Sequence, residues 1–332
     1  MSTMKFNPNG LLSDFPKRAE LPSIPGTPPG AAWFWGKDDE RGRLNLLTPE
    51  RLQQTTRENV RDGTVISMDL PLTFPSPPLF GRAAFEHKIL KLGVGGYDET
   101  YLLNPQSGSQ WDGFRHVAEP ETLQFYNGVT IDEIDARKED GSLASTRCGA
   151  GAWAKEGIVG RAVLLDVYGH LDEQIDAFTT RPITLKEVQS TAAAQGVEFR
   201  IGDILLIRTG WIAQYRAMSQ EKREALANIK GVYDYEFAGL EQSPEMLDFL
   251  HDNYFAAAAA DCIALEAWPP GKENVLHAHM LPRWGMPIGE LFDLEGVVEK
   301  CHREGRWTFL LSAAPDAVPG SIGSKANALA IF

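Results

Sequence analysis

Apolar residues gather along this chain in segments of strand length. Continuous apolar runs at 160–167 and 204–209 predict strands that are buried on both faces. Alternation with β-branched residues at 64–70 predicts a half-buried strand. Runs of small or branched apolar residues predict further strands at 255–264, 307–312 and 328–332. A sheet is therefore expected at the centre of the molecule.

Helix-start signals lie between several of these strands. Thr48 followed by proline combines a capping side chain with a first-turn proline, which predicts a helix to about residue 60. A capping box at 184–187 predicts a helix that ends near residue 196. Two more helices are expected at 244–252 and 294–302. Strands and helices alternate irregularly, so the predicted fold class is α/β with a mixed sheet.

Proline is concentrated in residues 1–35, which predicts an extended arm that wraps the body or reaches a partner subunit. The prolines of this arm are Pro8, Pro16, Pro22, Pro25, Pro28 and Pro29. No repeat or low-complexity linker divides residues 36–332, and these are expected to form a single domain.

Charge and cysteine content exclude several classes of protein. The chain has 45 acidic against 32 basic residues, a formal net charge of -13, and no basic cluster of the kind that binds nucleic acid or an anionic membrane. Its three cysteines are too few and too scattered for a disulfide framework. No apolar run reaches the length of a membrane span, and residues 1–12 lack a signal-peptide core. We therefore expect a cytoplasmic protein.

Polar residues recur at close spacing between 106 and 116. Gln106, Gln110, Asp112 and His116 carry oxygen or nitrogen atoms, and the small residues between them allow tight turns. Such a segment can bring several side chains to one point. On spacing alone, a polar loop without chemistry explains the pattern as well.

This segment resembles the signature of the cyclase family, which includes kynurenine formamidase and isatin hydrolase. The family pattern is His-x-Gly-Thr-His-x-Asp with another His four places after the Asp. The first two His and the Asp bind a divalent metal there, and the last His takes part in proton transfer. By position, Gln106 and Gln110 stand where the two ligand histidines would be. Asp112 and His116 match the ligand Asp and the last His.

The two glutamines change what this resemblance implies about a metal. An amide oxygen is a harder and weaker ligand than imidazole. A site at Gln106, Gln110 and Asp112 would bind zinc less tightly and would favour magnesium, manganese or calcium. Loss of the metal is the alternative, and Asp112 and His116 would then act as an acid–base pair.

A second segment, 276–290, resembles the downstream part of the family site, where a His and a Glu complete the centre. Glu290 matches the Glu. His277 fits the His better than His279 does, because it follows leucine as in the family. Similarity extends over most of the chain, from 35–50 through 157–166 and 202–211 to 323–331.

Two further residues are candidates for binding a substrate. Trp111 lies inside the first motif, where an aromatic wall would suit a flat ring. Arg115 could pair with a substrate carboxylate through its planar guanidinium. Core packing for Trp111 and surface exposure for Arg115 are the simpler explanations.

The resemblance implies the swivelling β/β/α fold of the cyclase family, a catalytic domain at 36–332, and a homodimer or homotetramer. The expected activity is hydrolysis of an amide, cyclic amide or lactone bond in a small aromatic acid, similar to an arylformamidase. Water would be activated by a divalent metal (manganese, zinc or magnesium) or by His116, with Asp112, His277 and Glu290 assisting. Two alternatives stay open: a lyase, dehydratase or cyclase of a secondary metabolite, and a non-catalytic binder of small molecules.

Overall fold

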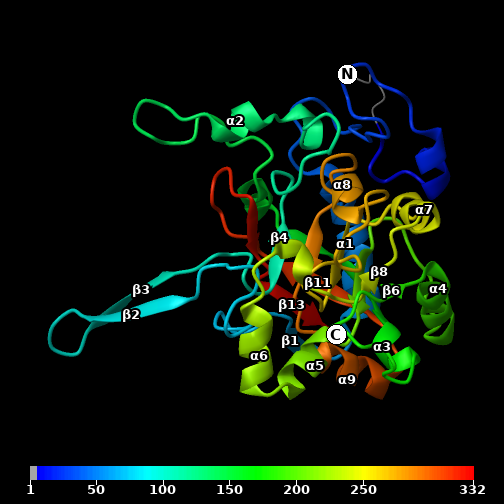
Figure 1. The fold of residues 1–332 in the computed structure, drawn as a ribbon. Helices are drawn as coiled ribbons and strands as arrows, with labels where there is room; N and C mark the ends of the chain where they lie inside the picture. Colours follow the sequence, from blue (N-terminus) through cyan, green and yellow to red (C-terminus); the bar gives the residue numbers. More distant parts are fainter. Residues whose placement is uncertain (1–5) are drawn as a thin grey trace.

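The computed structural model describes residues 6–332 and is centred on one nine-stranded mixed sheet (Figure 1). Its strand order is β1-β13-β11-β5-β7-β9-β10-β4-β12. The four strands β5, β7, β9 and β10 run parallel, and the flanking pairs are antiparallel. The bounds are β1 (Val65–Ser67), β4 (Gln110–Asp112), β5 (Ile158–Asp166), β7 (Ile204–Arg208), β9 (Ala257–Ala260), β10 (Ile288–Glu290), β11 (Thr308–Ala313), β12 (Gly323–Lys325) and β13 (Ala328–Ile331).

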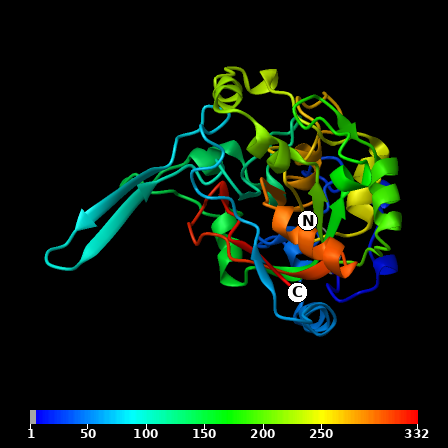
Figure 2. The same cartoon turned by 90° about the horizontal axis from the view of Figure 1, so that it is seen from below.

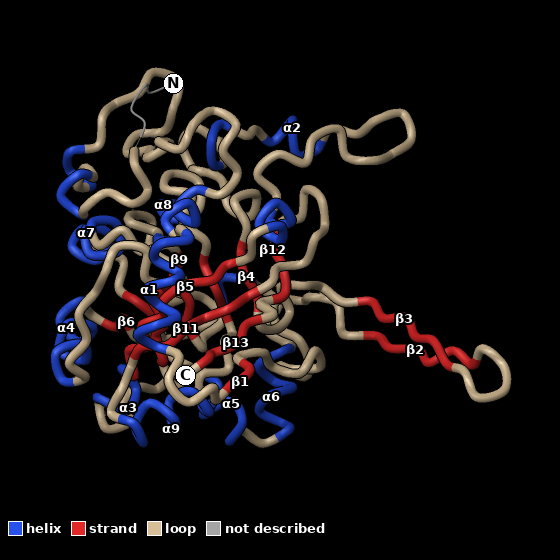
Figure 3. Tube along the Cα trace, turned by 180° about the vertical axis from the view of Figure 1, so that it is seen from behind, coloured by secondary structure: helices blue, strands red, loops and turns tan. Residues whose placement is uncertain are grey.

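Helices surround this sheet, and long loops connect them (Figure 3). The α-helices are α1 (Pro49–Asn59), α2 (Ile131–Asp135), α3 (Val167–His170), α4 (Leu185–Ala194), α5 (Trp211–Ala217), α6 (Gln220–Ala227), α7 (Pro244–Asp252), α8 (Leu276–Met280) and α9 (Glu295–Glu304). Helix α1 packs on β5 and β11, α3 packs on β7, and α4 packs on β5. Within residues 6–332, no helix has the length and apolar character needed to cross a bilayer.

The predicted mixed α/β fold is confirmed, and most of the predicted elements are present. The two continuous apolar runs form β5 and β7, which are buried throughout the parallel core except at two positions of β5. The capping threonine and the capping box begin α1 and α4 as expected. The strand expected at 64–70 is shorter, because the ladder ends at Ser67 and the Asp69 carboxylate accepts a hydrogen bond from the Ala328 amide at 2.8 Å.

The proline-rich segment wraps its own body over residues 6–35. The ring of Phe15 packs on that of Tyr254 with 4.7 Å between centroids. The Arg18 Nε lies 2.6 Å from the Asp248 carboxylate, and the Trp33 indole donates to the Pro282 carbonyl at 2.8 Å. The first five residues of the predicted arm lie outside the described residues.

Two small sheets lie beside the main one. Strands β6 (Pro182–Ile183) and β8 (Gly239–Leu240) form a short parallel pair. Strands β2 (Glu86–Lys91) and β3 (Tyr97–Leu102) form a hairpin that projects away from the body (Figures 1 and 2). The sequence interpretation did not include this hairpin.

Close packing between β9 and β10 sets the position of the strand that carries Glu290. Gly289 faces Ala259, and a Cβ added at Gly289 would lie 2.5 Å from the Cβ of Ala259 and 2.7 Å from the ring of Phe292. Only glycine therefore lets these two strands pair at this point. The small side chains of the four alanines in β9 allow the same close approach.

We predict that Gly289→Ala lowers the free energy of unfolding by about 1–3 kcal/mol, because the added methyl group overpacks a rigid contact. Denaturant titration measures this change. Gly271→Ala is the matched control, because its added Cβ has no neighbour closer than 3.8 Å. Equal stability of the two variants would contradict the prediction.

Candidate active site

Three polar side chains face the same side of the β4–β10 ladder. Gln110 and Asp112 are two residues apart on β4, so both point to one face of the sheet. Glu290 on β10 is the register partner of Gln110, so it points to the same face. All three are buried. Antiparallel pairing thus brings together two motifs that are 180 residues apart.

The two glutamines donate hydrogen bonds to the buried carboxylates. The Gln110 Nε2 donates to Glu290 Oε2 at 2.6 Å, and the Gln106 Nε2 donates to Asp112 Oδ1 at 2.7 Å. In this arrangement their nitrogens, rather than their oxygens, meet the acidic groups. Each amide therefore offsets part of the cost of burying a negative charge.

Helix α8 adds an imidazole to this cluster. The His277 Nε2 lies 3.2 Å from Glu290 Oε1 and 3.5 Å from Asp112 Oδ2. Its other ring nitrogen, Nδ1, lies 2.7 Å from Glu266 Oε2, and the His277 backbone amide donates to Glu266 Oε1 at 3.2 Å. Glu266 thereby fixes both the position of the helix start and the orientation of the ring.

Sequence interpretation missed Glu266. It is fully buried between two apolar stretches, near the end of the segment that continues from β9. A single acidic residue between apolar stretches could have indicated this role, because a buried carboxylate needs a partner. Its partner could not be named from the sequence.

Burial and mutual charge shift the ionisation of these groups. Burial would lower the pKa of His277, but the carboxylates of Glu266, Asp112 and Glu290 raise it well above its ordinary value. Burial and the nearby Asp112 carboxylate raise the pKa of Glu290 to about 7. Burial would raise the pKa of Asp112, but the imidazoles of His116 and His277 lower it to about 2. At neutral pH the site therefore combines the His277 imidazolium, the Asp112 carboxylate and a Glu290 side chain that is partly protonated.

His116 lies beside this cluster and differs from His277 in charge. Its Nε2 is 3.9 Å from Asp112 Oδ1, its Nδ1 is 3.3 Å from the Gln106 amide nitrogen, and the two imidazole rings are 6.2 Å apart. Burial lowers the pKa of His116 despite the attraction of Asp112. The ring is therefore neutral at pH 7 and can accept a proton.

A cavity of about 340 Å³ opens onto the cluster. Its polar wall consists of His116, His277, Glu266, Glu290 and Arg82. Its apolar and aromatic wall consists of Phe80, Val117, Val232, Tyr233, Ile263, Ala264, Trp268, Pro270 and Val275. The size and the mixture of a large apolar wall with a few polar groups suit a small organic ligand.

Arg82 is a cation at this cavity that the sequence interpretation did not single out. Its guanidinium lies over the Phe80 ring, 5.3 Å from the centroid, and donates to the Gln106 carbonyl. Its charge helps to lower the pKa of Asp112 and of His116. Among the residues that the structure describes, no carboxylate lies within ion-pair distance of it.

Comparison with known proteins identifies the family of this chain. The model of a family described as putative cyclase matches residues 37–267. The chain belongs to the putative cyclase family. No relative was found among curated proteins.

Solved structures share the fold of this cyclase-family chain. A protein described as a novel cyclase is 27% identical, with a TM-score of 0.79 over 91% of this chain and 97% of that one. Isatin hydrolase A from Labrenzia aggregata, bound to benzyl benzoate, is 17% identical, with a TM-score of 0.53 over 80% of this chain and 93% of that one. Isatin hydrolase A from Ralstonia solanacearum is 19% identical, with a TM-score of 0.54 over 85% and 95%.

Two expected binding residues of this cyclase-family chain lie outside the cavity. Trp111 is on β4 between Gln110 and Asp112, so its side chain points to the opposite face and packs on Phe292 with 5.0 Å between rings. Arg115 is buried, and its nitrogens donate to the carbonyls of Ser145, Arg147 and Gly320. Trp111 is thus a core residue, and Arg115 ties loops together.

Of the two histidines on α8, only His277 enters the cluster. The His279 ring packs near Trp284 and lies within 3.2 Å of the Arg283 guanidinium. Burial and the charge of Arg283 lower the pKa of His279 to about 3. This neutral ring belongs to the packing of α8 rather than to the site.

The cluster has the composition of a divalent-cation site. Ligand atoms of Asp112, His277 and Glu290 all lie within 4.8 Å of one another, and all three residues are buried. Asp112 Oδ2 and Gln110 Oε1 are buried without a hydrogen-bond partner. Three oxygen donors and one imidazole suit manganese, magnesium or zinc. This set differs from the expected trio of Gln106, Gln110 and Asp112, because Gln106 directs its nitrogen at the carboxylate.

We predict that Glu266→Gln lowers the pKa of His277, because the substitution removes the carboxylate that raises it and leaves the burial that lowers it. NMR titration of the ring protons in metal-free protein measures the change. Glu273→Gln is the matched control, since Glu273 is exposed and, among the described residues, is not a hydrogen-bond or ion-pair partner of His277. An unchanged pKa in Glu266→Gln would show that Glu266 does not set the charge of the ring.

Proposed function

We propose that this chain hydrolyses an amide, cyclic amide or lactone bond in a small aromatic acid. One observation carries the proposal: Asp112, Glu290, His277 and His116 meet at the end of one cavity with an aromatic wall. These groups include a proton acceptor, a proton donor and a fixed cation. Acyl hydrolysis needs those three functions. An activity like that of an arylformamidase is one member of this class.

Water attack and bond cleavage require two proton transfers. The water oxygen bonds to the carbonyl carbon, and its proton passes to neutral His116 or to ionised Glu290. The carbon–nitrogen or carbon–oxygen bond then breaks, and the same proton is delivered to the leaving nitrogen or oxygen. A group whose pKa lies near 7 can perform both transfers at neutral pH, and the pKa of Glu290 is about 7.

Negative charge that develops on the carbonyl oxygen needs a positive partner. His277 is held as an imidazolium by Glu266, and its position does not depend on the substrate. A preorganised cation of this kind stabilises the oxyanion without reorganisation. Asp112 keeps the His277 ring and the Gln106 amide in place around the reacting bond.

A divalent cation would be held by Asp112, His277 and Glu290, with the free oxygen of Gln110 beside them. When bound, such an ion would polarise the carbonyl and lower the pKa of water. His277 must lose its proton to act as a ligand, so cation uptake would release protons.

Arg82 supports a preference for substrates that carry a carboxylate. Its guanidinium lines the cavity next to an aromatic wall that includes Phe80, Tyr233 and Trp268. A flat ring between these side chains would bring its carboxylate to Arg82. Charge-assisted pairing with a planar guanidinium is strong and directional. Arg82 therefore takes the role expected of Arg115.

We predict turnover of at least one of N-formylkynurenine, isatin and an aromatic lactone, and a kcat lowered about 10²–10⁴-fold in His116→Asn and in Asp112→Asn. Each assay uses chelated protein and protein supplied with manganese, zinc or magnesium. His170→Gln is the matched control, because His170 contacts Ser190 far from the cavity residues. Product analysis by mass spectrometry identifies the bond that breaks.

Two outcomes would contradict hydrolysis. Loss of water from a substrate without cleavage would indicate the lyase or dehydratase alternative. Tight binding of these compounds without turnover, with or without a cation, would indicate a non-catalytic binder. Neither outcome would alter the assignment to the cyclase family.

We predict that Arg82→Gln raises KM for the carboxylate substrate by about 10–100-fold, the loss expected for one charge-assisted hydrogen-bond pair. The methyl ester of the same substrate lacks the charge, so its KM should be the same for wild type and Arg82→Gln. Arg82→Lys keeps the charge without the planar guanidinium, so its KM for the carboxylate substrate should lie between those of wild type and Arg82→Gln. A KM that rises equally for acid and ester would assign Arg82 a structural role only.

A further inference from the structure

The β2–β3 hairpin, residues 86–102, stands apart from the rest of the chain (Figures 1 and 2). Six residue pairs, from Glu86 opposite Leu102 to Lys91 opposite Tyr97, form a regular ladder. Within residues 6–332, neither strand pairs with a third strand. A two-stranded hairpin is only marginally stable alone in water. We call residues 86–102 the hairpin arm.

Apolar side chains on the hairpin arm are exposed to an unusual degree. Ile89, Tyr97 and Tyr101 are 68%, 67% and 51% exposed. Ladder register places all three on one face, because opposite residues share a face and alternate residues return to it. Further exposed apolar residues are Leu90, Leu92, Val94 and Leu102. The register places Leu90 and Leu102 on the opposite face, so both faces of the hairpin arm expose apolar side chains, as interaction surfaces do.

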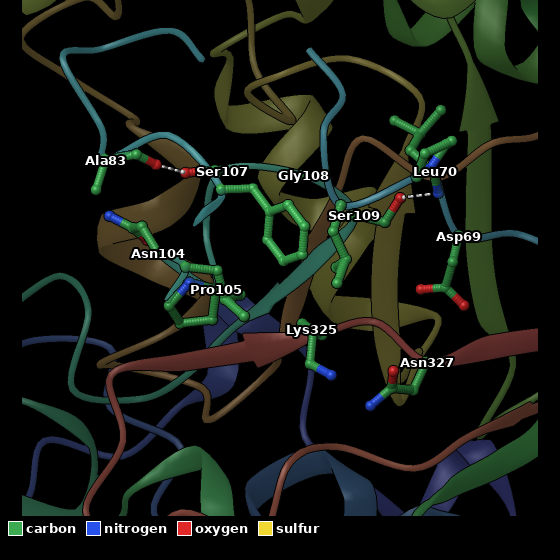
Figure 4. A pocket seen from close by; sticks show the side chains of 14 residues that line it. Asp69, Leu70, Ala83, Asn104, Pro105, Ser107, Gly108, Ser109, Lys325 and Asn327 are labelled. Atoms are coloured by element: carbon green, nitrogen blue, oxygen red, sulfur yellow. Dashed lines mark hydrogen bonds between the residues drawn. The ribbon is translucent and has the colours of Figure 1, made fainter. Parts of the chain in front are cut away.

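A second apolar surface lies at the root of the hairpin arm. A groove of about 330 Å³ is formed by residues 69–72, both ends of the hairpin, and residues 325–327 (Figure 4). Its apolar lining consists of Leu70, Pro71, Leu72, Ala83, Phe85, Leu103 and Pro105. Asp69 and Lys325 are its two charged residues. We call this the root groove.

We propose that the hairpin arm of one molecule docks in the root groove of a second copy of this chain, and that the exchange is reciprocal. The arm leaves from the wall of its own groove and points outward, so its tip cannot cover that groove. From Glu86 to Lys91 strand β2 spans about 17 Å, at about 3.4 Å per residue, and the turn that contains Val94 extends beyond it. Two arms side by side in opposite directions therefore bring each tip to the partner's root.

Self-association explains why the arm and the groove occur on one molecule. A twofold dimer uses the same patch on both subunits, so each chain must carry both halves of the contact. Aromatic side chains bury about 150–250 Å² each. Two tyrosines, five aliphatic side chains and the groove thus supply an area on the order of the 800 Å² per partner found in standard interfaces.

Charge at the two surfaces permits this approach. The chain carries a net charge of -13, which repels a second copy at most surfaces. The hairpin arm is nearly balanced, with Lys88 and Lys91 against Glu86, Asp98 and Glu99. The root groove holds one charge of each sign. Contact here therefore avoids the repulsion that the rest of the surface would produce.

Docking would also act on the active site through the chain. Strand β3 ends at Leu102, and Leu103 and Pro105 line the root groove just before Gln106. A partner arm in the groove would hold this segment and thereby the amide that donates to Asp112.

The first test is the mass of the protein in solution, measured by analytical ultracentrifugation over a range of concentrations. We expect wild type at a multiple of the 36.6 kDa chain, with the dimer as the smallest assembly. Ile89→Lys should weaken dimerisation at least tenfold, because it places a charge in the contact. The arm itself should stay folded, since residue 89 faces Glu99. Ile131→Lys, at an isoleucine that is 42% exposed, is the matched control.

The second test addresses geometry. A Val94→Cys chain is mixed with a Leu72→Cys chain and treated with a short bis-maleimide. The native Cys148, Cys262 and Cys301 are buried and should not react. We expect a cross-linked pair only in the mixture, since the tip of one arm then lies in the groove of the other.

Three results would overturn the proposal. They are a monomeric wild type, an assembly that Ile89→Lys leaves as tight as the control, and a dimer that shows no cross-link in the mixture. Replacing residues 87–101 by a short Gly-Ser turn provides an independent check, because it removes the arm without touching the sheet. Association that survives this deletion would assign the interface to another surface.

Discussion

Pairing of β4 with β10 is the constraint on which the site depends. It opposes Gln110 to Glu290 and Ile288 to Asp112, so residues from two distant segments share one face. The short β4 holds this position because β12 pairs with its other edge. The glycine at 289 lets β10 approach β9 closely enough for the sheet to remain continuous. Site geometry is therefore a consequence of strand register.

The site concentrates negative charge in a buried place. Asp112, Glu266 and Glu290 are all buried around one imidazole. Such an arrangement is costly unless each group has partners. His277 and two glutamine amides are these partners, and the charge of Arg82 acts from a longer distance. A divalent cation would offset the negative charge more effectively. The glutamines thus make a metal-free state less costly than it would be if carboxylates faced each other alone.

Compared with the histidines of the family signature, the two glutamines provide hydrogen-bond donors and no basic nitrogen. His277 and His116 remain as the imidazole rings that line the cavity, and their surroundings give the two rings different charges. Glu266 holds His277 positive, whereas burial keeps His116 neutral. One fold can thus keep acid and base functions next to each other through local surroundings, as different carboxyl groups do in other enzymes.

Local signals in the sequence determined much of the chain. Capping residues located α1 and α4, and apolar runs located β5 and β7, because these features depend on neighbours within a few residues. The two motifs also indicated Asp112, His116, His277 and Glu290 as candidate site residues. The orientation of Trp111 away from Gln110 and Asp112 could have been foreseen, since neighbouring residues of a strand point to opposite faces.

Tertiary structure alone decided the rest. Glu266 and Arg82 have no spacing pattern, and their roles arise from the segments that fold beside them. Arg115 is removed from the cavity by three carbonyls from distant loops. The hairpin arm was not predicted, because its strands mix polar and apolar residues without a core to face. A sequence encodes local preference directly, but the partner of a buried charge or an exposed strand depends on long-range packing.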